Sequence, residues 1–368
     1  MGKAAVKGLF HIIIIAATIV LAAITIIASR SGHYVPVNSV IMPLLGLAIP
    51  VLLLCNLAVA ICWTFARKWW ALVPLAAFLF NWPYLTSVIQ FNSTHEIPTD
   101  ALGKNNRPNG YLTVATYNVH SFGNEITGYS CKEIAKYMQK KHVDVLCFQE
   151  FGDNKYFPVD SLRHALSYWK YVSIPTGNSI HNVLPIAVFS RFPLANERFI
   201  AYPYSANCSM TCDIVLGMDT IRLLNNHLQT TSVSQNRKRW QRELATDDTR
   251  REAQAMQDAA GTLHDNFVKR AAQTDSICHL AITSPYPVLV CGDFNSLPSS
   301  HTYYQLSEIL QDGFKTGGCG YMYTYRYGKR LFRIDYAFHS PELECINYYS
   351  PDLDLCSDHN PVVFTVKY

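Results

Sequence analysis

Polar side chains suited to phosphate or metal chemistry recur where short apolar runs begin or end in this 368-residue chain. They are Asn118, Glu150, His227, Asp293, Asn295, Asp335, Asp358 and His359. Each one alone fits a turn, a cap or a solvated strand end. If such carboxylates, histidines and carboxamides were clustered without a functional role, they would repel one another or lack hydrogen bonds. We therefore expect them to form one site.

Strands have to position these residues, and runs rich in β-branched and aromatic residues predict eight of them. The predicted strands are Leu112–Tyr117, Val143–Phe148, Ile186–Phe189, Asp213–Leu216, Ile221–Leu224, Val288–Cys291, Asp335–Phe338 and Val362–Val366. Between the fifth and sixth strands, apolar residues recur at steps of three and four, which predicts a helix. These residues are Ala253, Met256, Ala260, Leu263 and Phe267. A mixed α and β domain follows.

The motifs around the polar residues resemble those of the endonuclease/exonuclease/phosphatase superfamily, which has the deoxyribonuclease I-like fold. The resemblance covers about Tyr111–Tyr368, and the motifs occur in the family's order. They read TYNVHSF at Asn118, DVLCFQE at Glu150, NNHL at His227, VCGDFNS at Asp293 and Asn295, RIDYAF at Asp335, and SDHNP at Asp358 and His359. The resemblance implies an α/β fold, a two-sheet sandwich flanked by helices, in which strand ends converge on one cleft.

The same resemblance implies roles for the metal and the phosphate. Glu150 would hold a divalent ion, Mg²⁺ or Mn²⁺, which prefers few carboxylates and several waters. Asn118 and Asp358 would support that ion or its waters. Asn295 and His227 would donate hydrogen bonds to phosphate oxygens while water attacks in line.

The resemblance implies that other residues of the site transfer the proton. Asp335 would orient His359, and either His359 or Asp293 would deprotonate the attacking water. The sequence leaves the choice between these two bases open. Two positions depart from the family: Pro185 precedes the strand at the cleft rim, and His120 stands where some nucleases have an acidic residue. Because His120 replaces an acidic residue, the sequence argues against a second metal site at this position.

A basic run with one aromatic residue, Arg237–Arg242, follows His227. It could track phosphates or contact lipid headgroups. It could equally be the solvated start of a helix, since Glu243, Asp247 and Asp248 follow closely. Both interpretations stay open.

Residues 1–95 differ in charge and composition from the rest of the chain. They contain no acidic residue and five basic ones, so they carry +5, whereas the remaining residues carry −1 and the whole chain +4. Gly8–Ala28, Ser39–Phe65 and Trp70–Ile89 are uncharged and close to the ~20 residues that cross a bilayer. We expect three transmembrane helices; the alternatives are a cleaved signal peptide for the first run and a buried core helix for the third. This pattern excludes a wholly soluble protein, a disordered chain and a uniformly basic nucleic-acid coat.

Basic residues beside the runs predict the orientation, because loops on the cytoplasmic side are enriched in Lys and Arg. Lys3, Lys7, Arg67 and Lys68 would lie on one side, with the N-terminus in the cytoplasm. Residues 1–90 would form the membrane domain, 91–110 a linker and 111–368 an extracytoplasmic catalytic domain. We expect an integral protein of a bacterial cytoplasmic membrane.

Cysteine positions add two expectations. Cys147 and Cys291 lie in apolar runs and should be buried thiols. Cys208 and Cys212 are close enough in sequence for a local disulfide to be considered, although spacing alone cannot establish one.

The sequence thus predicts a membrane-anchored, metal-dependent phosphoesterase. Its substrate would be a nucleic acid, or else a phospholipid, inositol phosphate or other small phosphate ester. The alternative from another class is a non-catalytic binding module on the same fold. No protein partner can be inferred.

Overall fold

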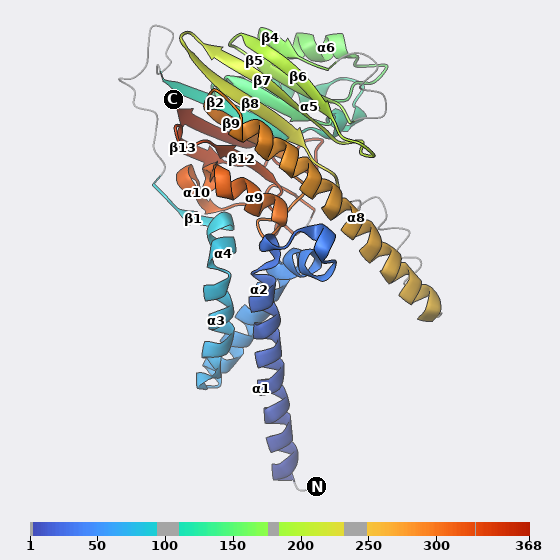
Figure 1. The fold of residues 1–368 in the computed structure, drawn as a ribbon, viewed down its shortest axis with the longest axis vertical. Coiled ribbons are helices and arrows are strands. Elements are labelled where there is room, and N and C mark those ends of the chain that lie inside the picture. The colour runs from blue at the N-terminus through green and yellow to red at the C-terminus, as the bar shows by residue number, and fades with distance from the viewer. Residues whose placement is uncertain (1–2, 94–109, 176–183, 232–248, 328) are drawn as a thin grey trace.

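The computed structural model describes residues 3–93, 110–175, 184–231, 249–327 and 329–368. Two β-sheets of six strands each pack face to face, helices cover the outer faces, and apolar helices project from one end (Figure 1). The predicted two-sheet fold is confirmed.

The first sheet holds the strands that lead to Asn118 and Glu150. In spatial order it contains β13 (Glu344–Tyr349), β14 (Val362–Lys367), β2 (Tyr111–Asn118), β3 (Val145–Gln149), β5 (Ile186–Ser190) and β4 (Tyr171–Ser173). β2 and β3 are parallel, and Asn118 pairs with Gln149. Parallel neighbours end at the same edge of a sheet, so Asn118 and Glu150 emerge side by side.

The second sheet holds the strands that carry His227, Asp293 and Asp335 at their ends. Its order is β10 (Gln311–Asp312), β12 (Asp335–His339), β9 (Val288–Asp293), β8 (Asp219–His227), β7 (Cys208–Leu216) and β6 (Leu194–Ala201). β8 is parallel to β9 and ends with His227 opposite Asp293. β12 is antiparallel to β9 and begins with Asp335 opposite Asp293.

The core lies between the two sheets and includes Cys147 and Cys291, which are buried as predicted. The outer face of the first sheet is covered by α5 (Tyr129–Lys140) and α6 (Val159–Ala165). The second sheet is covered by α8 (Thr249–Ile282) and α9 (His301–Ile309), and α10 (Gly313–Gly317) lies beside β13. A short 3₁₀ segment, η5 (His120–Asn124), follows β2.

The local disulfide that the sequence left open does not form. Cys208 and Cys212 are free, buried thiols of the single strand β7. Residues four apart in a strand lie about 13 Å apart. A disulfide needs α-carbons within about 7 Å, so an extended strand excludes it.

Two helices, α1 (Lys3–Ala28) and α2 (Ile41–Phe65), are long and apolar enough to cross a membrane. The expected third transmembrane helix is not shown, because the segment is bent and counts as a span only if both of its helices cross together. That segment starts with η3 (Trp69–Ala71) and divides into α3 (Leu72–Phe80) and α4 (Trp82–Val88), with a bend of 67° at the break.

Local chemistry explains the break. Pro83 has no N–H with which to continue the helix from α3. At the break, the Asn81 side chain donates hydrogen bonds to the carbonyl oxygens of Ala77 (2.9 Å) and Thr25 of α1 (3.0 Å). The polar corner of the segment is therefore held against α1.

The ends of the apolar helices pack against the sandwich. The α1–α2 connection contains η1 (Ser31–His33) and η2 (Pro36–Asn38). Ser31 Oγ donates to the Ser299 carbonyl (2.7 Å), and Ser299 Oγ donates to the Gly46 carbonyl of α2 (2.8 Å). After α4, β1 (Ile89–Phe91) pairs with β11 (Cys319–Tyr321). The expected linker lies outside the described residues from 94 to 109.

Candidate active site

The predicted site residues converge at one edge of the sandwich and come from both sheets. Asn118 connects the sheets: its Nδ2 donates to Glu150 Oε1 (3.2 Å) and to Asp293 Oδ2 (3.0 Å). Its Oδ1 accepts from the backbone N–H of His120 (3.1 Å). Asn118 therefore holds one carboxylate of each sheet in place.

His359 and Asp335 form the closest pair. His359 Nδ1 lies 2.9 Å and 3.2 Å from the two Asp335 carboxylate oxygens. The opposite ring nitrogen, Nε2, lies 3.7 Å from Asp293 Oδ2 and 3.9 Å from Asp358 Oδ1. The imidazole is thus oriented by Asp335 and directed at Asp293.

Burial and neighbouring charge oppose each other at His359. Burial favours the neutral imidazole, but the charges of Asp335 and Asp293 outweigh it and raise the pKa of His359 to about 10. Burial also raises the pKa of the Asp293 carboxyl above its ordinary value. At neutral pH, His359 is therefore an imidazolium next to a carboxylate whose proton affinity is increased.

Glu150 and His227 occupy the other side of Asp293. His227 Nε2 lies 3.7 Å from both Glu150 Oε1 and Asp293 Oδ2. Burial lowers the pKa of His227 more than the two carboxylates raise it. Burial raises the pKa of Glu150, but the His120 hydrogen bond, the His227 charge and the Asn118 hydrogen bond lower it to about 2. At neutral pH, Glu150 is ionised beside a neutral imidazole.

Asn295 lies at the rim, two residues beyond the end of β9. Its backbone N–H donates to Asp293 Oδ1 (2.8 Å), which closes a tight turn, and its φ of 49° is in the left-handed region that Asn tolerates. Its Nδ2 donates to the Leu228 carbonyl (3.0 Å). The second hydrogen of this amide group is the one that could reach a phosphate oxygen.

Residues 115–359, more than half of the chain, match the Endonuclease/Exonuclease/phosphatase family. The chain belongs to this family. The resemblance seen in the motifs is thereby confirmed. Residues 11–88 match a domain of unknown function, DUF8431. No curated protein matches the sequence.

Several solved structures are similar to this chain. An endonuclease/exonuclease/phosphatase family protein from Leptotrichia buccalis has 17% identity and a TM-score of 0.48, covering 70% of this chain and 100% of that one. The corresponding protein from Beutenbergia cavernae has 15% identity and a TM-score of 0.48, covering 70% and 71%. The human Nocturnin catalytic domain, with a bound sulfate anion, has 17% identity and a TM-score of 0.47, covering 70% and 93%.

Members of the endonuclease/exonuclease/phosphatase family hydrolyse phosphoester bonds and depend on divalent metals. The donor set here suits such an ion. Asp293, Asp335 and His359 have possible ligand atoms that all lie within 4.8 Å of one another, and with His359 protonated the two carboxylates are the donors of this group. Glu150 and Asp358 add carboxylates that are about a quarter exposed. Hard oxygen donors with excess negative charge fit Mg²⁺ or Mn²⁺.

The two departures from the family have structural consequences. His120 Nδ1 lies 3.4 Å from Glu150 Oε2, and the hydrogen bond that the protonated ring donates to Glu150 raises the pKa of this histidine. An acidic residue there would instead add negative charge beside Glu150. The Pro185 carbonyl accepts from the Phe151 N–H (2.9 Å), so the proline fixes the backbone immediately after Glu150.

Three supporting residues were missed by the sequence analysis. Ser357 Oγ accepts from the His359 N–H (3.0 Å) and donates to the Asn118 carbonyl (2.6 Å). Thr324 Oγ1 accepts from the N–H of Asp335 (3.0 Å). The Tyr325 ring meets the His359 ring edge-on, with centroids 5.4 Å apart. Ser357 stands inside the SDHNP motif and could have been found there. Thr324 and Tyr325 carry no such signal.

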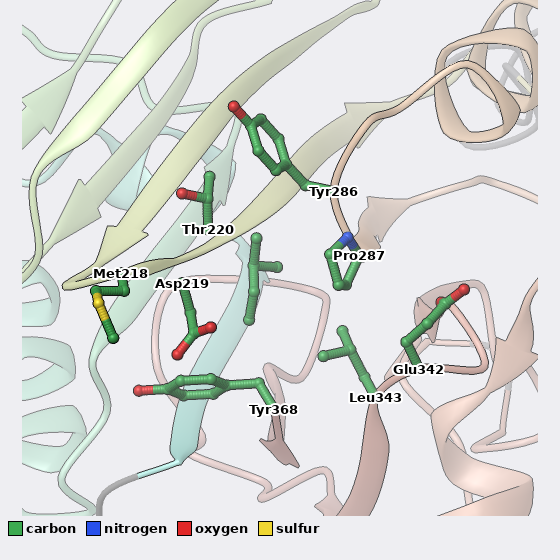
Figure 2. A pocket seen from close by; sticks show the side chains of 9 residues that line it. Met218, Asp219, Thr220, Tyr286, Pro287, Glu342, Leu343 and Tyr368 are labelled. Atoms are coloured by element: carbon green, nitrogen blue, oxygen red, sulfur yellow. The ribbon is translucent and has the colours of Figure 1, made fainter.

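A hollow of about 290 Å³ lies at the opposite ends of the strands (Figure 2). It is lined by Met218, Asp219, Thr220, Ile221, Tyr286, Pro287, Glu342, Leu343 and Tyr368. Strands β8 and β9 begin beside it and end at the active site. None of the catalytic candidates lines this hollow. The basic run Arg237–Arg242 lies outside the described residues.

Proposed function

We propose that this protein is a membrane-anchored, divalent-metal-dependent phosphoesterase. The observation that carries the proposal is the contact network of Asn118, Glu150, Asp293, Asp335 and His359, which draws on both sheets. Burying an imidazolium and two carboxylates together is costly, which favours a catalytic site over a binding module. A bound divalent ion would be held by Glu150 and Asp358 with the support of Asn118, and it would supply charge stabilisation to the phosphate oxygens.

The charge states favour one assignment of the acid and base. An imidazolium at His359 cannot accept a proton, whereas Asp293 is a carboxylate of increased proton affinity. We therefore assign the deprotonation of the attacking water to Asp293. His359 Nε2 donates a hydrogen bond to the phosphate as negative charge develops, and Asp335 holds the ring. His227 and Asn295 are placed to donate to other phosphate oxygens.

The apolar helices support the anchor and its orientation. α1 runs toward the sandwich, α2 runs away from it, and α3 with α4 returns (Figure 1). Lys3, Arg67 and Lys68 then share the end away from the sandwich. By the enrichment of basic residues on the cytoplasmic side, the catalytic domain faces the extracytoplasmic space.

The test uses the full-length protein in detergent with a soluble ester, bis-p-nitrophenyl phosphate, and Mg²⁺. Glu150→Gln and His359→Ala should each lower kcat at least about 100-fold, since a lost ligand or proton-transfer group costs about that much. Asp354→Asn, at a surface carboxylate that is 89% exposed, is the matched control and should retain full activity. Undiminished hydrolysis in excess EDTA would exclude the metal.

A further inference from the structure

Two short segments tie the active site to the ends of the apolar helices. One runs from Asn295 at the cleft to Ser299, which is hydrogen-bonded to Ser31 and Gly46 beside α1 and α2. The other runs from Tyr325, against His359, back to Tyr321, which pairs with Ile89 just after α4. The first and last residues of each segment are four positions apart, so their α-carbons lie at most about 14 Å from each other. The cleft therefore lies close to the membrane surface.

The junction that holds the cleft there is made of buried polar contacts. The guanidinium of Arg333 donates to the Ser87 carbonyl in α4 (2.7 Å) and to both oxygens of Asp312 (2.6 and 2.7 Å). Arg333 is fully buried. Two residues later the same segment supplies Asp335. A site fixed in this way cannot move far from the bilayer.

The strand β1, which pairs with β11 in a ribbon, follows directly after α4 (Figure 1). Paired residues of two strands share a face. Here the exposed face carries Ile89, Phe91, Cys319 and Tyr321, and Phe91 is 89% exposed. Aromatic residues with a polar tip are typical of membrane–water interfaces. This face belongs at the lipid surface.

From that ribbon, a row of tyrosines leads to the catalytic histidine. The tyrosine row consists of Tyr321, Tyr323, Tyr325 and Tyr327. Neighbouring rings within it have centroids 6.2 Å apart, both at Tyr321–Tyr323 and at Tyr325–Tyr327. The intervening Met322 and Thr324 are buried. The alternation leaves Tyr321, Tyr323 and Tyr325 on the less buried side of the segment, which leads from the β1–β11 ribbon to His359.

The basic group beside the row is paired with a carboxylate. Arg330 lies over the Tyr323 ring at 5.6 Å, its side chain is 68% exposed, and it forms an ion pair with Asp352 (3.6 Å). An exposed guanidinium beside an aromatic ring can exchange such a carboxylate for the phosphate of a lipid headgroup at an anionic interface. The chain beyond residue 95 carries a formal charge of −1, which does not favour binding of a nucleic acid through many phosphates.

We propose that the substrate is a membrane lipid with a phosphate-ester headgroup, and that the tyrosine row is the surface along which it reaches His359. This inference rests on the proposed phosphoesterase function. In the reaction, water forms a new bond to phosphorus, the bond from phosphorus to the alcohol oxygen breaks, and the alcohol leaves with the proton taken from the water. The chains of the lipid stay in the bilayer throughout.

The experiment reconstitutes the full-length protein, with Mg²⁺, into phosphatidylcholine vesicles that contain phosphatidylglycerol, phosphatidic acid or sphingomyelin in turn. Released headgroup or phosphate is measured after the vesicles are lysed. Bis-p-nitrophenyl phosphate is assayed in parallel, and a single-stranded oligonucleotide serves as competitor substrate. We expect at least one lipid to be hydrolysed faster than the oligonucleotide.

Variants test the surface itself. The double variant Tyr321→Ala/Tyr323→Ala should lower the ratio of lipid to soluble-ester hydrolysis about tenfold, as expected for the loss of two aromatic contacts. Tyr321→Phe/Tyr323→Phe keeps the rings and should keep the ratio. Tyr171→Ala is the matched control, because Tyr171 is 41% exposed against 49% for Tyr321 and pairs with Ser190, at the far end of β5.

The outcomes separate the two proposals. Hydrolysis of the soluble ester without hydrolysis of any lipid overturns the lipid inference and leaves the phosphoesterase function standing. Hydrolysis of neither overturns both. Faster cleavage of the oligonucleotide than of every lipid, or a ratio unchanged in the double alanine variant, overturns the lipid surface.

Discussion

Replacing Asp335 by asparagine should reduce catalysis by changing the proton affinity of His359. The carboxylate lies 2.9 Å from Nδ1 and contributes more than Asp293 to the raised pKa of this histidine. The difference between the ordinary value near 6.5 and about 10 corresponds to about 5 kcal/mol in favour of the imidazolium. Because Asp335 makes the largest contribution that raises the pKa, part of this preference should disappear in the variant and the proton affinity of His359 should fall by at least about tenfold.

The assay is the pH dependence of kcat for bis-p-nitrophenyl phosphate at a fixed free Mg²⁺ concentration. If protonated His359 is the active form, activity falls on the alkaline side, and Asp335→Asn moves that fall to lower pH. At the optimum, kcat should drop about 100-fold, because the ring also loses its orientation. Asp354→Asn is the matched control and should leave the profile unchanged. An alkaline limb that stays in place would refute the argument, and an acidic limb that moves instead would make His359 the base.

The interaction between His359 and Asp335 also leads to a prediction of how the stability of the protein depends on pH. Folding favours the protonated form of His359, because its pKa is higher in the folded protein than in the unfolded chain. The stabilisation is complete below about pH 6.5 and is lost as the pH rises through about 10. In detergent with EDTA, the Tm of the wild type should therefore decrease over this interval. The Tm of Asp335→Asn should change less, and equal slopes for the two proteins would contradict the assigned charge state.

Two further predictions concern the junction and the orientation. Arg333→Met should lower the free energy of unfolding by about 3–5 kcal/mol, since it leaves Asp312 buried without its cation. Adding Asp312→Asn should restore part of the lost Tm. No recovery of Tm would show that the two residues are not coupled. A reporter that requires export should be active when fused after Tyr368 and inactive when inserted at Arg67, and the reverse pattern would place the catalytic domain in the cytoplasm.

The strands that carry the site were predictable because they are buried and end in distinctive residues. The predictions for β2, β3, β8 and β9 each miss residues at one or both ends, most often the polar ones. Asn118, Gln149 and His227 belong to their strands, although the sequence prediction ended each strand at the last apolar residue before them. Ladder hydrogen bonds to a neighbouring strand compensate for their weak strand propensity.

The missed strands are those in which packing, and not local sequence, decides the conformation. β6 (Leu194–Ala201) is an edge strand with a register shift between Ala195 and Arg198, so its side chains do not alternate cleanly. β13 (Glu344–Tyr349) has a similar irregularity after Cys345. Neither shows the period of two on which strand prediction depends.

The bend in the third apolar segment was not predicted for a different reason. Hydropathy counts apolar residues and gives little weight to a single Asn followed by Pro, although together these end a helix. Asn81 is nearly fully buried, and its side chain is satisfied by α1. A partner contact from elsewhere in the chain thus decides where this segment bends, and a local pattern cannot reveal it.

The charge state of His359 is equally a product of the assembled structure. The SDHNP and RIDYAF motifs identify His359 and Asp335, but they leave the separation of the two groups and their burial unknown. Both quantities determine whether the imidazole or the imidazolium is stable, because burial favours the first and the two carboxylates favour the second. The choice of base, which the sequence left open, therefore depends on tertiary geometry.

The RIDYAF segment also shows why the anchor and the catalytic site form one structural unit. Arg333 contacts α4 through the Ser87 carbonyl, and Asp335, two residues on, orients His359. The residue between them, Ile334, donates its N–H to Thr324, at the inner side of the tyrosine row. A displacement of α4 would therefore shift the segment that sets the imidazole, so the position of the apolar helices and the geometry of the cleft are coupled. The sequence boundary at 91–110 separates parts of the chain that this segment joins.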